Sequence, residues 1–348
     1  MKSSAAVTIA VIVLQLAACG SSGPRSAYVT LLPDPAASGH VWHWTVHCPF
    51  GPATGGSCRE AGPNLGSAQL AADGWNLGGT GNTGSLDMSV GSRGVVTING
   101  GFASTPPCTA STCIAPSALT WVRGYPSVLY GINQCHAGTS PPRSQVLPLP
   151  MRLASIAPRL IGVTAYSADT AQVTYDVAYD LWLHNSATRR PCQSGGTLEI
   201  MVWTDYAERA LLPASMQVGT GSVPFAVDHV PHAGAGAWSV YASNIETGGR
   251  TAPWGGTLWF VLRPADIISH GLVSVDLSAV LKAADQLLRG SYGWPELGPR
   301  YWLDTASFGV EFGPASGNPT DSGPSRFSVQ ISRYCLAVRS TLAAAGCA

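Results

Sequence analysis

The chain has 348 residues, of which 45% are hydrophobic and 11% charged, and its 19 basic and 19 acidic residues give a net charge of zero. This balance argues against a nucleic-acid-binding protein, which would carry an excess of basic residues. The hydrophobic content argues against a disordered chain, because it is large enough to build a core. Forty glycines and 26 prolines predict many turns and few long helices.

The first 19 residues have the features of a secretory signal peptide. Lys2 supplies a positive charge, and the apolar run that follows it is too short to cross a bilayer as a stable helix. The run ends in Leu-Ala-Ala-Cys-Gly, which resembles the lipobox of bacterial lipoproteins. The resemblance implies that Cys19 is lipidated, and that the protein is exported and either anchored to the outer face of the cell membrane or secreted after release. The alternative is an ordinary signal peptide cleaved near Ala18.

Residues 20–39 are rich in Gly, Ser, Pro and Ala and predict a flexible tether. We interpret residues 40–348 as a single domain. Beyond Cys19 the chain has an even number of cysteines, which in an exported protein predicts disulfide bonds. The simplest of many possible pairings joins Cys48 to Cys58, Cys108 to Cys113, Cys135 to Cys192 and Cys335 to Cys347. The histidines are scattered, so we expect no metal site and no cofactor.

Short β-type runs separated by Gly- and Pro-rich loops follow along the rest of the chain. They predict strands at 68–77, 85–98, 119–131, 159–166, 171–183, 196–205, 222–227, 236–243, 257–263, 301–312 and 326–333. Helical periodicity is convincing only over 276–289, which predicts one amphipathic helix. Many strands and one helix predict an all-β fold, a jelly-roll sandwich of two antiparallel sheets with a concave cleft. Residues 40–67 show a weaker strand pattern and are interpreted as an elaboration of the same domain.

Three of the predicted strands carry acidic side chains on one face. Because side chains alternate along a strand, the segment 197–203 has an aliphatic face and an opposite face with Glu199, Met201 and Trp203. By the same alternation the opposite face of 173–183 carries Asp176, Asp180 and Trp182, and that of 307–312 carries Glu311. No Lys or Arg occurs in these runs, although a solvated sheet face would normally carry them.

Two carboxyl groups that flank a polysaccharide are the groups that glycoside hydrolysis needs, and aromatic side chains beside them can stack on sugar rings. The alternative is that these acids only make a sheet face soluble.

At these residues the chain resembles glycoside hydrolase family 12, the small β-jelly-roll endoglucanases. The segment Leu198–Trp203 is similar to the family's Glu-x-Met-x-Trp nucleophile strand, and Val177–Leu183 to the strand before it. The segment Phe308–Phe312 is similar to the acid/base strand, with Val310 where the family usually has Phe. The resemblance covers about residues 68–333. Long insertions near 100–118 and 228–256 leave the substrate preference open.

The resemblance implies retaining hydrolysis of β-1,4-glucan by a monomeric enzyme without a cofactor. Glu199 is then the nucleophile, Glu311 the acid/base, and Asp180 the residue that orients the nucleophile. Substrate contacts are expected from Trp75, Met201, Trp203, Trp182 and Tyr130. Cellulose, mixed-linkage glucan and xyloglucan remain open as substrates. The alternatives are a non-catalytic carbohydrate-binding jelly roll and a structural envelope lipoprotein.

Overall fold

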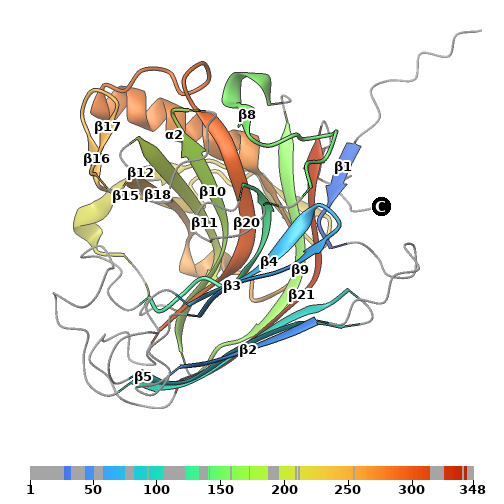
Figure 1. Ribbon diagram of the computed structural model, residues 1–348. Helices are drawn as coiled ribbons and strands as arrows, with labels where there is room; N and C mark the ends of the chain where they lie inside the picture. The colour runs from blue at the N-terminus through green and yellow to red at the C-terminus, as the bar shows by residue number, and fades with distance from the viewer. Residues whose placement is uncertain are drawn as a thin grey trace, which may run out of the picture.

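The structure is a computed structural model in which the chain folds into two large sheets. It describes residues 27–32, 44–50, 58–74, 82–91, 94–104, 122–132, 140, 142–156, 159–171, 173–186, 196–207, 210, 212–253, 255–313, 325–338 and 341–342. Both sheets are strongly curved and lie face to face (Figure 1). The expectation of an all-β jelly-roll sandwich is therefore confirmed.

One sheet, here called the outer sheet, has nine strands. Its order is β14 (Val230–His232), β13 (Phe225–Val227), β19 (His270–Asp276), β9 (Leu160–Asp169), β21 (Ser325–Val338), β6 (Val96–Ser104), β5 (Asn82–Val90) and β2 (Trp44–Phe50), and β1 (Ala27–Thr30) also pairs with β21.

The other sheet, here called the site sheet, has ten strands. Its order is β12 (Gln217–Gly221), β15 (Trp238–Ser243), β18 (Gly256–Leu262), β11 (Thr197–Tyr206), β10 (Thr174–His184), β20 (Trp302–Gly313), β7 (Ser127–Gly131), β4 (Ala68–Gly74) and β3 (Cys58–Leu65), and β8 (Met151–Arg152) also pairs with β20. A separate small hairpin is formed by β16 (Ile245–Glu246) and β17 (Arg250–Thr251), and short 3₁₀ turns lie at Leu153–Ser155, Ala214–Met216 and Pro264–Asp266.

The main core lies between the two sheets and contains the aliphatic faces that the alternation predicts. Leu198, Ile200 and Val202 of β11 are each fully buried in it. Phe308 of β20 packs in the same core against Tyr179 of β10, with ring centroids 4.8 Å apart. The opposite face of these strands, which carries the acidic residues, is thereby turned away from the core.

One strand pair departs from the antiparallel expectation, because β11 and β18 are parallel. A parallel pair needs a crossover connection, and the chain between these strands is long enough to provide one. On its way it adds β12 and β15 to the site sheet and β13 and β14 to the outer sheet.

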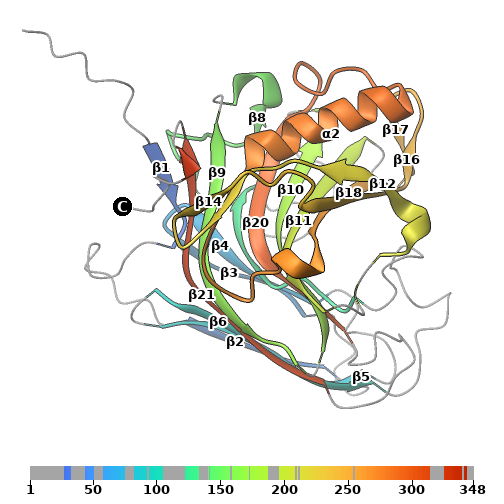
Figure 2. The same cartoon turned by 180° about the vertical axis from the view of Figure 1, so that it is seen from behind.

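The predicted helix is present as α2 (Leu277–Tyr292) and ends three residues beyond the predicted range. Asp276 caps its first turn by accepting a hydrogen bond from the backbone N–H of Ala279 at 2.9 Å. Gly293 ends the helix in the left-handed conformation, with φ of 62°, which a glycine adopts without strain. The helix lies across one end of the sandwich beside β16 and β17, as both views show (Figure 2).

Three expectations about the chain's organisation need correction. The predicted strand 85–98 is a hairpin of β5 and β6, because Gly94 adopts a φ of 70° in the turn between them. Residues 40–67 contain β2 and β3, which are members of the two sheets rather than an addition to them. Part of the predicted tether is also structured, since β1 pairs with β21 and Val29 is 2% exposed.

Several expectations concern residues outside the described part of the chain. These include the signal peptide with Cys19 and the cysteines Cys108, Cys113, Cys135, Cys192 and Cys347. Cys335 lies buried on β21, and the disulfide pairing as a whole stays a prediction. In the described part of the chain, no helix has the length and apolar character that crossing a membrane requires.

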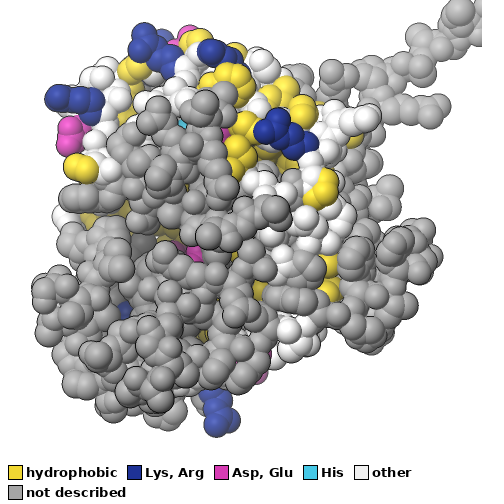
Figure 3. Space-filling model, viewed as in Figure 1, with side chains coloured by type: hydrophobic (Ala, Val, Ile, Leu, Met, Phe, Trp, Pro, Cys, Tyr) yellow, Lys and Arg dark blue, Asp and Glu magenta, His cyan; other side chains and the backbone are white. Residues whose placement is uncertain are grey.

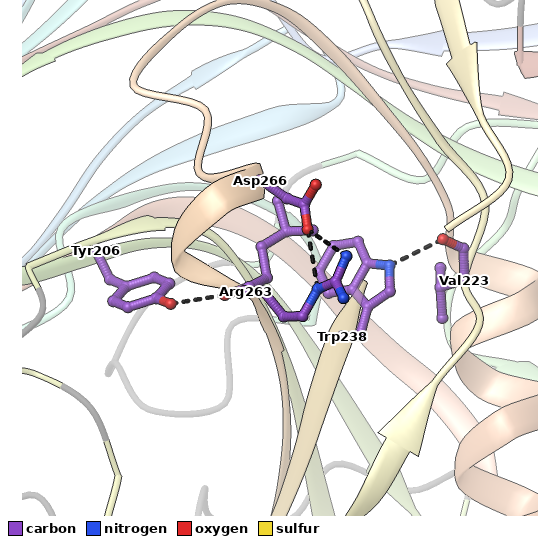
Figure 4. Close-up of polar contacts among 6 residues, drawn as sticks. Tyr206, Val223, Trp238, Arg263 and Asp266 are labelled. Carbon is purple, nitrogen blue, oxygen red and sulfur yellow. Dashed lines mark hydrogen bonds and ion pairs between the residues drawn. The ribbon is translucent and has the colours of Figure 1, made fainter. Parts of the chain in front are cut away.

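The surface charge of the described residues follows the composition. Lys and Arg side chains lie singly around the edges of the visible face rather than in one basic patch (Figure 3). One exposed ion pair joins the Arg263 guanidinium to the Asp266 carboxylate at 3.0 Å, just after β18 (Figure 4).

In the same region, two buried aromatic side chains donate hydrogen bonds that connect strands of the site sheet to neighbouring parts of the chain. The Tyr206 hydroxyl donates to the carbonyl oxygen of Leu262 at 2.7 Å, which ties the end of β11 to the end of β18. The Trp238 indole donates to the carbonyl oxygen of Val223 at 2.8 Å and so connects β15 to the chain entering β13 (Figure 4).

Candidate active site

The three acid-bearing strands are neighbours in the middle of the site sheet, in the order β11, β10, β20. Across β10 and β11, Glu199 lies opposite Trp182, and Met201 lies opposite Asp180. Across β10 and β20, Asp176 lies opposite Glu311. Directly opposed residues share a face, and so do alternate residues along one strand. The structure therefore brings the carboxyl groups of Glu199, Asp180 and Glu311 to one face of one sheet.

Glu199 is only partly buried, and its Oε2 accepts a hydrogen bond from the hydroxyl of Thr257 at 2.9 Å. Thr257 is the residue opposite Glu199 on β18, so the parallel strand pair brings the hydroxyl to the carboxylate. A hydrogen bond to the ionised form of an acid stabilises that form. Thr257 thus helps to keep Glu199 as a carboxylate, which is the form that a nucleophile requires.

Asp180 is 3% exposed and lies between the two predicted catalytic acids. Its Oδ2 accepts a hydrogen bond from the Trp182 indole at 2.6 Å, and its Oδ1 has no hydrogen-bond partner within the described part of the chain. Burial, followed by the charge of Glu199, raises the pKa of Asp180 well above its ordinary value. Asp180 and Glu199 lie on neighbouring strands of the acidic face, and the orienting role of Asp180 stays a prediction.

Glu311 is 6% exposed, and burial raises its pKa from 4.5 to about 7. An acid with this pKa retains its proton in mildly acidic solution and loses it near neutrality, as a general acid/base must. Asp176, directly opposite on β10, is fully buried, and its pKa is also raised well above the ordinary value by burial and by the charge of Glu311. The sequence alone predicts no contact between these two acids.

Tyr125 also lies beside this group of acids. Its hydroxyl donates to the carbonyl oxygen of Ala178 at 3.0 Å, midway between Asp176 and Asp180 on β10. Burial and then the charge of Asp180 raise the pKa of Tyr125 well above 10, so the phenol stays protonated. Tyr125 therefore supports the strand that carries both aspartates.

The predicted aromatic contacts have different positions. Trp182 is half-buried on the acidic face. Met201 is 2% exposed and Trp203 is fully buried, with its ring centroid 6.0 Å from that of Tyr206. Trp203 therefore packs within a second apolar cluster on this face of the sheet and offers no exposed ring to a sugar. Trp75 lies outside the described residues, and its role stays a prediction.

The expectation for Tyr130 is corrected by its orientation. Tyr130 lies opposite Ala306 on β20, and both belong to the core between the sheets. Its hydroxyl donates to the carbonyl oxygen of Leu147. The side chain is 1% exposed and points away from the acidic face, so it is placed for packing rather than for substrate contact.

Sequence reasoning missed Thr257 and the position of Asp176 opposite Glu311. For Thr257 the available signal is the alternation in Thr257-Leu258-Trp259, which puts a hydroxyl and an indole on one face of β18. For Asp176 no local signal exists, because the pairing depends on strand register. Among the described residues, no group of three or more His, Cys, Asp or Glu side chains is arranged to hold a metal ion.

Comparisons with known proteins identify the fold. No family model matches the chain, and no curated protein matches it. Among solved structures, one described in a comparison of family 12 glycoside hydrolases is 20% identical, with a TM-score of 0.51, over 85% of this chain and 100% of that chain. A native family 12 xyloglucanase from Bacillus licheniformis is 18% identical, with a TM-score of 0.51, over 84% of this chain and 100% of that chain. The chain thus shares the fold that its sequence motifs predict.

Proposed function

We propose that this protein is a retaining glycoside hydrolase that cleaves β-1,4-glucan chains internally. The observation that carries the proposal is the placement of Glu199 and Glu311 on strands either side of β10, on one face of one sheet. Their environments differ as the two roles require, since Glu199 accepts a hydrogen bond from Thr257 and the pKa of Glu311 is raised to about 7. The family 12 fold of the solved structures is consistent with this activity.

In the proposed first step, a carboxylate oxygen of Glu199 attacks the anomeric carbon. Glu311 gives its proton to the departing glycosidic oxygen as that carbon–oxygen bond breaks. Glu199 is then esterified and no longer charged. In the second step Glu311 takes a proton from water, the water oxygen attacks the anomeric carbon, and the ester bond to Glu199 breaks. Asp180 orients Glu199 throughout.

Substitution of each catalytic acid tests the proposal. Glu199→Gln and Glu311→Gln should each reduce hydrolysis of a soluble β-1,4-glucan by several orders of magnitude while the protein stays folded. Asp169→Asn is a matched control, because Asp169 is an exposed acid on the outer sheet. Near wild-type activity in either glutamine variant would reject the assignment. If the wild-type protein bound the polysaccharide but released no reducing sugar from it, the protein would be a carbohydrate-binding protein instead.

Two further measurements define the reaction. Proton NMR of the first-formed product should show the β anomer, and an α product would mean that the enzyme inverts. A panel of carboxymethyl-cellulose, mixed-linkage glucan and xyloglucan then identifies the preferred substrate. The structural neighbour from Bacillus licheniformis is named as a xyloglucanase, which makes xyloglucan a necessary member of the panel.

We also propose that the protein is exported and held on the cell membrane through lipid attached to Cys19. The support is the lipobox-like sequence that ends the apolar N-terminal run. Cys19→Ser should abolish the lipid mass of the mature chain and release the protein from the membrane fraction. An unlipidated wild-type chain would contradict this proposal and would leave the proposed catalytic activity unaffected.

A further inference from the structure

Asp176 and Glu311 form a pair of buried acids. They are directly opposed in the register of β10 and β20, and their side chains share the acidic face. Asp176 is fully buried and Glu311 is 6% exposed. Among the residues that the structure describes, none donates a hydrogen bond to either oxygen of Asp176 or to the Oε2 of Glu311. Because directly opposed residues on one sheet face have Cβ atoms about 4.5–5.5 Å apart, the two carboxyl groups lie within reach of each other.

Two facing carboxyl groups without donors cannot both be ionised in a buried site, so the pair must hold at least one proton. Asp176 is the better place for it, because Asp176 is the more buried of the two. It also faces the charges of Asp180 on its own strand and Glu199 on β11, besides that of Glu311. The hydroxyl groups of the two neighbouring tyrosines donate to carbonyl oxygens, that of Tyr206 to Leu262 and that of Tyr125 to Ala178.

Arg123 is a buried cation whose backbone lies beside the strand that carries Glu311. The backbone N–H of Arg123 donates to the carbonyl oxygen of Phe312, next to Glu311, at 2.8 Å. The guanidinium of Arg123 directs Nη1 toward the carbonyl oxygen of Val122 at 3.4 Å. The effects that set the pKa of Glu311 are its burial and its hydrogen bond with Asp176.

We propose that Asp176 is a positioning residue that stays a neutral carboxylic acid and donates a hydrogen bond to Glu311. This proposal rests on the proposed function of Glu311. When Glu311 gives its proton to the departing oxygen, it becomes a carboxylate and the hydrogen bond from Asp176 becomes charge-assisted. When Glu311 takes the proton of water, the bond weakens again. Asp176 keeps its own proton throughout and is unchanged over the cycle.

The consequence is an asymmetric response to substitution. A donor to the carboxylate lowers the pKa of Glu311 and so opposes the effect of burial. Asparagine at position 176 keeps a neutral donor, whereas alanine removes it. If Asp176 were instead an anion, its charge would raise the pKa of Glu311, and asparagine would remove that effect.

The first test compares the pH dependence of kcat/KM in Asp176→Asn, Asp176→Ala and the control Asp169→Asn. In the wild type the alkaline limb should lie at about pH 7, the pKa of Glu311. We expect Asp176→Asn to keep this limb. We expect Asp176→Ala to move it upward by about one unit and to lower kcat about tenfold, with KM little changed. A downward shift in Asp176→Asn would overturn the proposal, and so would an unchanged limb and kcat in folded Asp176→Ala.

The second test needs neither hydrolysis nor a stable alanine variant. Carboxyl ¹³C NMR of the labelled wild-type protein, with Asp176→Asn used for assignment, follows the Asp176 carboxyl through pH 7. We expect this carboxyl to remain protonated at pH 7. Titration near the ordinary value of about 4 would overturn the proposal. Activity retained in Glu199→Gln would instead reject the proposed function and leave this titration intact.

Discussion

The hydroxyl of Thr257 donates a hydrogen bond to the carboxylate of Glu199 across the parallel pair of β18 and β11, at 2.9 Å. Thr257 is 8% exposed, so water has little access to replace it as a donor. The carboxyl group of the proposed nucleophile is thus positioned by a residue 58 positions further along the chain, whose hydrogen bond favours the ionised form.

Thr257→Val should therefore weaken the nucleophile without changing the shape of the site much. The carboxylate loses a donor, so the acid limb of kcat/KM against pH should move to higher pH. Because hydrogen bonds to charged groups contribute about 1.5–3 kcal/mol, kcat/KM at the optimum should fall about tenfold or more. Thr257→Ser keeps the hydroxyl and should restore both properties. A valine variant with the wild-type acid limb would show that the hydrogen bond has no catalytic role.

The raised pKa of Glu311 also predicts how folding stability depends on pH. In the unfolded chain Glu311 titrates near 4.5, and in the folded protein at about 7. Between these values the folded state binds more protons, so the free energy of unfolding should fall as pH rises from about 4.5 to 7. Urea unfolding at several pH values measures this slope. Glu311→Gln should reduce the slope and leave the part that comes from Asp176 and Asp180, whose pKa values are also raised. An unaltered slope in that variant would mean that Glu311 does not contribute to it.

Trp182→Phe separates the hydrogen-bonding role of the indole from its ring. The variant loses the 2.6 Å hydrogen bond to Asp180 and keeps an aromatic side chain on the acidic face. Because that bond holds the Asp180 carboxyl in place beside Glu199, its loss should let the carboxyl turn and reduce kcat/KM about tenfold.

Trp302→Phe is the matched control for this change. Trp302 is also half-buried on the site sheet, but Arg152 stacks over its ring at 4.9 Å and it lies opposite His184. Its substitution should leave kcat/KM unchanged. Equal effects of the two tryptophan substitutions would mean that ring packing, and not the bond to Asp180, matters for activity.

A buried chain of hydrogen-bonded polar side chains, centred on His184, lies where β10 ends beside β11 and β20. The Nδ1 of His184 lies 2.6 Å from Oδ2 of Asp304, and its Nε2 lies 3.1 Å from the hydroxyl of Thr197. His184→Ala removes a buried partner of Asp304 and should cost about 2–5 kcal/mol of unfolding free energy.

The exposed pair Arg263–Asp266 offers the contrast, since Asp266→Ala should cost less than about 1 kcal/mol. Thermal and urea unfolding measure both effects. Similar small losses in the two variants would mean that the polar chain through His184 contributes no more than a surface ion pair.

Much of the candidate site follows from local sequence pattern. Alternation along a strand is a local property of the backbone, and it correctly assigns Leu198 and Ile200 to the core and Glu199 to the opposite face. The helical period of 276–289 is equally local, and α2 occupies Leu277–Tyr292. The resemblance led us to expect that Tyr130 contacts substrate, and this was wrong because Tyr130 on β7 packs in the core opposite Ala306 of β20.

The sequence by itself therefore determined the fold class, the strands that carry the acids and the face on which each acid lies. Only the tertiary structure decided which acidic side chain lies opposite which on the neighbouring strand. A shift of four residues between β10 and β20 keeps every side chain on its face, so alternation cannot distinguish Asp176 from Asp180 as the residue opposite Glu311. The position of Thr257 likewise depends on a crossover that no local pattern encodes, because non-local strand pairing is settled by packing of the whole sandwich.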